Sequence, residues 1–305
     1  MMEPALSDIA RPNETRRDLW LKAMRPRTLM IALAPILVGA AHAHAVFGAI
    51  ALTPVVAAAC SALAIQIATN LANDAADGER GADGPHRIGP MRVTGAALMS
   101  AYDVRRGALV ATLVAALFGL VAVVYGGLPI LGIGLASIAA AWSYSYGPRP
   151  ISATPLGEAF VLLFFGVAAT VGVEYLAAGR VHALAFGFGV AIGLPAAAVL
   201  TVNNHRDRAQ DATNGRRTLA ILLGPTGAKW LYAIELIAAS LLAAALVASV
   251  STRGALLAAA TLAPAVALAW RVAGMPITSE LNGRLAATGA FQMLLAISIA
   301  IGLRL

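Results

Sequence analysis

Long apolar runs alternate with short polar segments along the whole chain. A helix needs about 20 apolar residues to cross the ~30 Å hydrocarbon layer of a bilayer, and nine runs approach that length. Small residues are frequent in them, which suits close contact between helices in lipid. The pattern predicts an all-α polytopic membrane protein with nine transmembrane helices at residues 29–48, 51–72, 107–126, 129–146, 156–177, 183–203, 228–250, 254–273 and 286–303.

Composition supports this class and excludes others. Hydrophobic residues make up 59% of the 305 residues, charged residues only 12%, and the mean hydropathy is +0.78. Soluble domains carry roughly 25% charged residues, so a water-soluble enzyme and a disordered chain are both excluded. Cys60 is the only cysteine, which rules out an internal disulfide. We expect a cytoplasmic N-terminal segment, residues 1–28, followed by a single transmembrane domain, residues 29–305.

Basic residues are concentrated in one set of loops. The chain has 22 Lys and Arg residues and a net charge of +7. With nine spans, the N-terminus shares its side with the loops after the second, fourth, sixth and eighth spans, and that side holds every basic residue except Arg180, Arg253 and Arg304. Such an excess marks the cytoplasmic side of a bacterial-type inner membrane. The charge therefore indicates orientation in a bilayer, and we expect no nucleic-acid partner.

Two polar segments directly follow the second and the sixth apolar runs. Their polar residues are Asn70, Asn73, Asp74, Asp77 and Asp83 in the first segment, and Asn203, Asn204, Arg206, Asp207 and Asp211 in the second. If the helices continue, residues four apart share one face. Stacked carboxylates near lipid repel each other unless a cation lies between them. Each segment thus predicts either a cation site or, taken alone, an ordinary solvated helix end.

The residue types in these segments favour one cation in particular. Oxygen ligands without His or Cys favour Mg²⁺, which takes a few carboxylates together with phosphate oxygens. Two facing aspartate clusters therefore predict a diphosphate bridged by Mg²⁺. Arginines can bind the remaining phosphate oxygens through paired hydrogen bonds. The candidates are Arg87, Arg92, Arg206, Arg208, Arg216 and Arg217.

Both segments resemble signatures of the UbiA superfamily of intramembrane aromatic prenyltransferases, and more narrowly its 1,4-dihydroxy-2-naphthoate polyprenyltransferase branch in menaquinone synthesis. The first signature, NDxxDxxxxxD followed by RxGPxR, is matched over residues 73–92. The second, NNxRDxxxDxxxGKxTL, is matched over residues 203–219. Arg216 stands where a lysine is common, and Glu158 stands where an aspartate is expected. The resemblance runs in order over nearly the whole chain.

The resemblance implies nine helices around a central cavity and Mg²⁺-dependent transfer of a polyprenyl group from polyprenyl diphosphate to an aromatic acceptor. In the naphthoate branch the ring carboxylate leaves as CO₂ and the product is demethylmenaquinol. The implied catalytic and metal-binding carboxylates are Asp74, Asp77, Asp207 and Asp211, with Asn73 as a neutral metal ligand. The implied substrate-binding residues are Asn70, Asn73, Asp83, Arg87, Arg92, Asn203, Asn204, Arg206, Arg216, Arg217, Tyr146 and Arg25.

Several side chains keep more than one interpretation. Asp83 and Glu158 are candidates for the acceptor of the ring proton, and each is also interpretable as an ordinary loop carboxylate. Arg25 either attracts the carboxylate of the acceptor or only sets orientation before the first span. Tyr144 and Tyr146 either line the cavity or anchor the chain at the membrane interface.

Two alternative functions stay open. The first keeps the chemistry and changes the acceptor, for example to 4-hydroxybenzoate. The second is a cation-coupled transporter, because carboxylates inside a membrane often mark ion paths. The middles of the apolar runs are almost free of ionisable groups, and the nearest carboxylates, Glu174 and Glu235, lie near run ends. The sequence therefore favours an enzyme whose partners are a polyprenyl diphosphate, an aromatic acceptor and the lipid bilayer.

Overall fold

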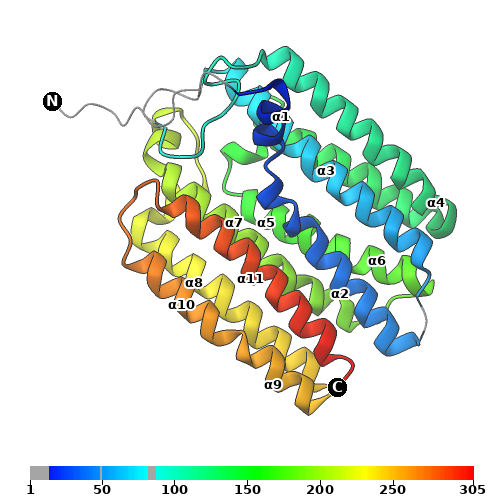
Figure 1. Cartoon of the computed structure of the whole chain (residues 1–305). Coiled ribbons are helices and arrows are strands. Elements are labelled where there is room, and N and C mark those ends of the chain that lie inside the picture. The colour runs from blue at the N-terminus through cyan, green and yellow to red at the C-terminus, as the bar shows by residue number, and fades with distance from the viewer. Residues whose placement is uncertain (1–13, 49, 82–86) are drawn as a thin grey trace.

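Every regular element in the described part of the chain is a helix, which confirms the predicted all-α class (Figure 1). The computed structural model describes residues 14–48, 50–81 and 87–305, so Asp83 and residues 1–13 lie outside it. The helices are α1 (Arg16–Met24), α2 (Met30–Phe47), α3 (Leu52–Glu79), α4 (Ala101–Ser145), α5 (Gly157–Leu162), α6 (Ala169–Ala178), α7 (Leu184–Thr213), α8 (Leu219–Ala248), α9 (Thr252–Ala260), α10 (Leu262–Ala273) and α11 (Leu281–Gly302).

Eight helical segments among the described residues are long and apolar enough to cross a membrane. One of them, α4, has 45 residues and contains a non-helical kink at Gly127, with φ 61° and ψ −149°. The indole nitrogen of Trp142 donates a hydrogen bond to the Thr112 hydroxyl at 3.1 Å, so the two halves of α4 lie side by side. The kink coincides with the predicted break between 107–126 and 129–146, and α4 therefore supplies two of the nine predicted spans.

Helices α3 and α7 continue beyond their apolar runs. The predicted spans end at residues 72 and 203, whereas the helices end at Glu79 and Thr213. The acidic segments are therefore helical, as the spacing of their carboxylates required. The predicted loops after these spans are correspondingly shorter in the structure, because their polar side chains are bonded within the fold while the backbone stays helical.

The polar segments gather at one end of the bundle. Figure 1 shows α1, residues 87–100 before α4 and the turn between α7 and α8 at one end of the bundle, while the C-terminus lies at the opposite end. An odd number of spans places α1 and the C-terminus at opposite ends in this way. These are the segments whose arginines and lysines were predicted to share the cytoplasmic side.

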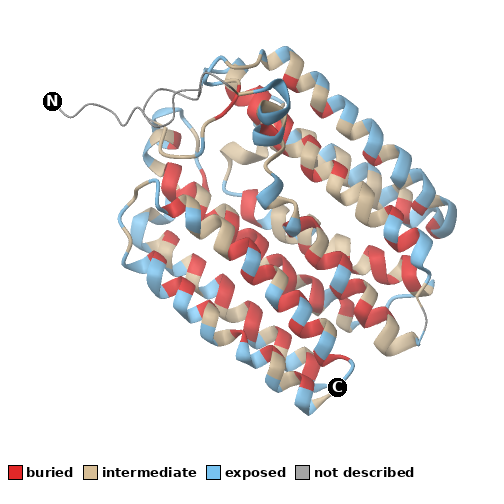
Figure 2. Ribbon diagram, viewed as in Figure 1, coloured by how far each residue is buried: buried red, intermediate tan, exposed pale blue. Residues whose placement is uncertain are grey.

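The outer surface of the bundle is apolar. Val124, Leu128 and Trp270 are 82%, 81% and 80% exposed, and exposed residues follow the outer faces of α4, α9 and α10 (Figure 2). A large continuous apolar surface is rare on soluble monomers. This surface is suited to contact with lipid hydrocarbon.

Gly166 allows the backbone of its own helical segment to touch the backbone of α7, beside the cavity described below. Gly166 lies in a π-helical segment (Leu163–Ala168) that joins α5 to α6. A Cβ at this position would lie 2.4 Å from the Gly189 carbonyl oxygen and 2.6 Å from Gly193 Cα, both in α7. Backbone atoms cannot rotate away as a side chain can, so this approach requires glycine.

We expect Gly166→Ala to lower the free energy of unfolding by about 1–3 kcal/mol, the usual range for overpacking. Thermal unfolding in mild detergent measures the change. Gly132→Ala is the control, because the described residues put nothing within 4 Å of a Cβ there. Equal melting temperatures for the two variants would contradict the close packing of the π-helical segment on α7.

Candidate functional site

A cavity of about 470 Å³ lies between α2, α3, α4, α5, α6 and α7. This volume lies within the range of small-molecule sites. Charged side chains lie along its mouth, whereas the rest of the wall is mostly apolar. The charged residues that line it among the described residues are Arg25, Asp77, Arg87, Arg92, Asp207, Asp211 and Arg216.

Helix α3 supplies one side of the mouth. Asn70, Asn73 and Asp77 line the cavity on successive turns, as the helical repeat requires. The buried Asp77 carboxylate accepts hydrogen bonds from Arg216 Nη2 at 2.6 Å and forms an ion pair with Arg92 Nη2 at 3.0 Å. Asp77 is therefore held at the mouth in its ionised form by two guanidinium groups.

Helix α7 supplies the opposite side through Asn203, Asn204, Asp207 and Asp211. Arg206 donates two hydrogen bonds to the neighbouring Asp207 carboxylate, from Nε at 2.7 Å and from Nη2 at 2.6 Å. The same guanidinium donates to Asn203 Oδ1 at 2.8 Å and, on α11, to Asn282 Oδ1 at 2.7 Å. Arg206 is 1% exposed, so its hydrogen bonds serve to fix the α7 carboxylate.

Arg216 joins the two sides. Its Nη2 lies 2.6 Å from Asp77 Oδ1 on α3, and its Nη1 lies 3.3 Å from Asp211 Oδ1 on α7. Burial disfavours the charged guanidinium, but the two carboxylates outweigh it and raise the pKa of Arg216 above its ordinary value. The two aspartate clusters therefore face each other across one cavity, with a cationic group between them.

A loop between α1 and α2 adds Arg25 to the mouth. This residue ends α1 in a left-handed conformation, φ 53°. The Asn70 amide nitrogen donates to Met24 O at 2.8 Å and to Thr28 Oγ1 at 3.0 Å, on either side of Arg25. Burial, reinforced by Arg92, lowers the pKa of Arg25 to about 9, which leaves it cationic at neutral pH. Asn70 thus holds the backbone that presents this charge.

Four of the predicted site residues that the structure describes do not line the cavity, namely Asp74, Arg206, Arg217 and Tyr146. Asp74 accepts hydrogen bonds from Thr94 N at 3.2 Å and Thr94 Oγ1 at 2.6 Å, so it anchors the segment that follows Arg92. Arg206 donates its hydrogen bonds to Asp207, Asn203 and Asn282. Arg217 is exposed, and its backbone N–H donates to a loop carbonyl.

Tyr146 is the fourth of these residues, and its ring packs against Trp142 with 5.5 Å between ring centroids. Burial raises the pKa of Tyr146 to about 12, and Glu79 adds to the shift. Tyr144, two residues earlier, lines the cavity instead. The sequence named both tyrosines, but only packing at the end of α4 separates them.

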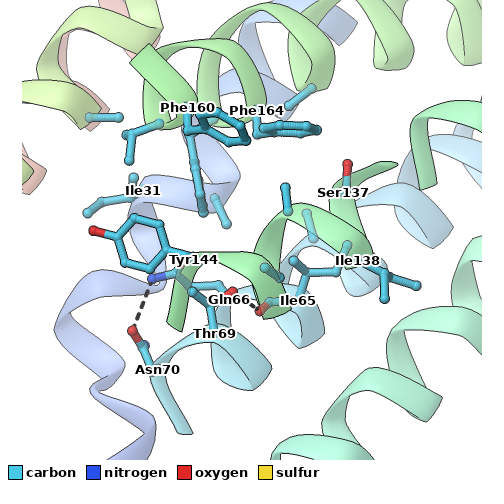
Figure 3. Close-up of a pocket in the computed structure, with 18 of the residues that line it drawn as sticks. Ile31, Ile65, Gln66, Thr69, Asn70, Ser137, Ile138, Tyr144, Phe160 and Phe164 are labelled. Atoms are coloured by element: carbon cyan, nitrogen blue, oxygen red, sulfur yellow. Dashed lines mark hydrogen bonds between the residues drawn. The ribbon is translucent and has the colours of Figure 1, made fainter. Parts of the chain in front are cut away.

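Other residues of the wall had no role in the sequence analysis. Gln66, Thr69, Ser137, Phe160 and Phe164 line the cavity with Tyr144, and Figure 3 shows the two phenylalanines opposite Gln66 and Thr69. Gln66 carried one usable signal, since it is a polar residue inside an apolar run, four positions before Asn70. The carboxylates of the transporter alternative, Glu174 and Glu235, lie outside the cavity wall.

The donor chemistry at the mouth fits Mg²⁺. Within the described ranges, no three His, Cys, Asp or Glu side chains converge as a ready-made metal site. Mg²⁺ needs no such cage, because it uses one or two carboxylates together with water and phosphate oxygens. Asp77 lies one turn from Asn73, and Asp207 one turn from Asn203, so each side offers a carboxylate and an amide oxygen.

Comparisons with known proteins show which family the chain resembles. The model of the UbiA prenyltransferase family matches residues 32–298. The chain is 36% identical over 213 residues to a 1,4-dihydroxy-2-naphthoate octaprenyltransferase of Mycobacterium tuberculosis, covering 70% of this chain and 72% of the relative. It is 37% identical over 237 residues to the enzyme of the same name from Escherichia coli, covering 73% and 74%.

The fold is also similar to a solved structure of a UbiA homolog from Archaeoglobus fulgidus bound to DMAPP and Mg²⁺. The TM-score is 0.66 at 15% identity, covering 94% of this chain and 99% of the other. Family match and relatives cover most of the sequence, and the apolar helices account for its place in a membrane. The chain is an integral membrane prenyltransferase that belongs to the UbiA prenyltransferase family.

Proposed function

We propose that the chain transfers a polyprenyl group from polyprenyl diphosphate to 1,4-dihydroxy-2-naphthoate, with Mg²⁺ and with loss of CO₂, to give demethylmenaquinol. The observation that carries the proposal is the mouth where aspartates and arginines from α3 and α7 meet above an apolar cavity. The names of the bacterial relatives support this acceptor, and the archaeal homolog bound to DMAPP and Mg²⁺ supports the metal.

The arginines at the mouth bind the diphosphate. Arg87, Arg92 and Arg216 line the same end of the cavity as the aspartates, and forked guanidinium groups suit phosphate oxygens. Asp77, Asp207 and Asp211 would hold Mg²⁺, with Asn73 as a neutral ligand and Asp74 as a further candidate. When bound, Mg²⁺ stabilises the negative charge on the departing diphosphate.

The reaction needs charged side chains at one end of the cavity and the exclusion of water at the other. The allylic C–O bond breaks and the pyrophosphate leaves with the electron pair, stabilised by the arginines. A ring carbon of the acceptor forms the new C–C bond, and the ring carboxylate leaves as CO₂, returning its bonding pair to the ring. The apolar wall, including Phe160 and Phe164, keeps water from quenching the allylic cation.

The proposal also covers the site of the acceptor carboxylate, the extent of the transferase domain and its orientation in the membrane. Arg25 attracts the acceptor carboxylate, because it lines the mouth and carries a positive charge. Residues 29–305 form the transferase domain, and residues 25–28 of the preceding segment complete its mouth. The N-terminal segment and the loops at this end face the cytoplasm of a bacterial-type cell, as the excess of basic residues favours.

The test is a coupling assay with purified protein, Mg²⁺, geranyl diphosphate and 1,4-dihydroxy-2-naphthoate labelled in its carboxyl group. We expect one labelled CO₂ for each prenylated product, no product in EDTA, and recovery when Mg²⁺ is restored. A parallel reaction contains 4-hydroxybenzoate. Coupling to hydroxybenzoate alone would overturn the acceptor, and activity unaffected by EDTA would overturn the role of the metal.

A further inference from the structure

A second polar group lies in the cavity wall, beyond the charged mouth. Gln66 of α3 lines the cavity and is 7% exposed. It shares one face of α3 with Asn70, Asn73 and Asp77, which follow it by 4, 7 and 11 positions. At 1.5 Å per residue, Gln66 lies roughly 16 Å along the helix from Asp77. It is thus too far from Asp77 to contact the same diphosphate, although it lies only one helical turn from Asn70 at the edge of the mouth.

The hydrogen bonds around Gln66 determine which way its amide points. Thr28 Oγ1 donates to Arg25 O at 2.9 Å, so its lone pairs face Gln66 and Asn70. Gln66 Nε2 donates to Thr28 Oγ1 at 3.3 Å and to Asn70 Oδ1 at 3.5 Å. Asn70 is oriented independently, because its Nδ2 donates to Met24 O. The nitrogen of Gln66 therefore faces this network, and its oxygen faces elsewhere.

Gln66 Oε1 is buried and has no hydrogen-bond partner among the described residues. A buried carbonyl oxygen without a donor is unfavourable, so such an atom in the wall of a binding cavity is a place where a bound molecule can donate a hydrogen bond. The ligand must bring an O–H or N–H donor. A phosphate oxygen and a hydrocarbon tail both lack one, which excludes the two ends of the prenyl diphosphate.

The surroundings of Gln66 suit a flat ring. Tyr144 lies next to Gln66, and Phe160 and Phe164 lie on the opposite wall of the pocket (Figure 3). The two phenylalanine rings are 5.9 Å apart and tilted by 31°. Aromatic rings favour offset or edge contacts with other rings. A hydroxylated aromatic molecule satisfies both the apolar walls and the unpaired oxygen.

We propose that Gln66 is a specificity-determining residue that accepts a hydrogen bond from a ring hydroxyl of the aromatic acceptor onto Oε1. This inference rests on the proposed function. A hydrogen bond to Thr28 links Gln66 to the loop that carries Arg25. Gln66 and Arg25 therefore contact two different substituents of the same ring. Gln66 binds the hydroxyl, and Arg25 attracts the carboxylate. The ring lies between Tyr144 and the phenylalanines.

The test compares Gln66→Met, which keeps the length of the side chain and removes both amide atoms, with the wild-type protein. The dissociation constants of 1,4-dihydroxy-2-naphthoate, 1-hydroxy-2-naphthoate and 4-hydroxy-2-naphthoate are measured for each. We expect removal of one of the two hydroxyls to weaken wild-type binding roughly tenfold, and to weaken binding to Gln66→Met hardly at all. The hydroxyl whose removal ceases to matter is the one that Gln66 binds.

Gln292→Met is the matched control. Gln292 is a fully buried glutamine of α11 whose Nε2 donates to Ile192 O at 3.0 Å, and its Oε1 also has no partner among the described residues. It lies outside the cavity wall, so its loss should leave the ranking of the three acceptors unchanged. Thr28→Val, which loosens Gln66 without removing it, should reduce the discrimination in part.

The outcomes separate this inference from the proposed function. If Gln66→Met still distinguishes the hydroxyls as the wild type does, or weakens all three acceptors equally, the role of Gln66 is wrong even though the enzyme prenylates dihydroxynaphthoate. If the wild type binds geranyl diphosphate but neither binds nor prenylates dihydroxynaphthoate, the proposed acceptor itself is wrong. Should Gln66→Met not fold, the comparison is made with Thr28→Val, and unchanged discrimination there contradicts the inference.

Discussion

Asp77→Asn is expected to lower kcat by roughly 10²- to 10³-fold, the loss typical of removing one group that stabilises charge in a transition state. Asp77 is the carboxylate of α3 that lines the cavity, and it faces Asp211 across Arg216. Asparagine keeps the size of the side chain and one acceptor oxygen but removes the charge. The α3 side of the mouth would then offer Mg²⁺ no charged ligand.

The KM for the diphosphate should change much less than kcat. Asp77 pairs with Arg92 and Arg216. Its neutralisation weakens the competition with the anion for both guanidinium groups, while Arg216 keeps its contact with Asp211. The rate is measured at saturating concentrations of both substrates, and a Mg²⁺ titration should show half-maximal activity at a higher concentration. Asp103→Asn is the control, since the Asp103 carboxylate accepts a hydrogen bond from the Ser100 hydroxyl at the start of α4 and does not line the cavity. A kcat within threefold of the wild type would contradict the role of Asp77.

Arg206→Leu is expected to destabilise the fold by about 3–5 kcal/mol, the range for removing one partner of a buried ion pair. The guanidinium is 1% exposed and holds Asp207, Asn203 and Asn282 at once. Leucine fills much of the space but removes both hydrogen bonds to the largely buried Asp207 carboxylate, which keeps only the more distant contact with Arg87 Nη2, at 4.0 Å, among the ion pairs of the described residues. Thermal unfolding in mild detergent should show a large fall in Tm.

Arg206→Lys should fall between the two proteins, because lysine keeps the charge but cannot form the paired hydrogen bonds to Asp207. The exposed Arg149→Leu serves as the surface control. The fall in Tm should be specific to the buried position, and bound geranyl diphosphate with Mg²⁺ should restore part of it by mass action. A Tm for Arg206→Leu that equals that of Arg149→Leu would contradict the assignment.

The chain order of apolar and polar residues was enough to predict the helical architecture. The break between the third and fourth runs is a local property, because Gly127 and Pro129 interrupt the helix wherever it packs. The placement of the acidic segments on α3 and α7 followed in the same way, from carboxylates spaced one turn apart. The described residues of the two signatures, at 73–81, 87–92 and 203–219, also lie at one end of the bundle, as two facing aspartate clusters required.

Roles within those signatures depended on the rotation of each helix against its neighbours. Asp74 and Asp77 are about 60° apart on α3 by the 3.6-residue repeat, yet one bonds the Thr94 backbone and the other lines the cavity. Arg206 and Arg216 both follow the sixth run. The first is fixed beside Asp207, and the second spans to α3. No spacing in one segment reveals such partners, since they come from distant parts of the chain.

The sequence by itself determined that this protein crosses a membrane as a helical bundle and carries two aspartate-rich segments at one end, because periodicity, hydropathy and motif spacing are local properties. Only the tertiary structure decided that Tyr144 rather than Tyr146 lines the cavity, and that Gln66 lines it with a buried amide oxygen that has no partner among the described residues. Which side chain reaches a shared cavity depends on the packing of several helices together.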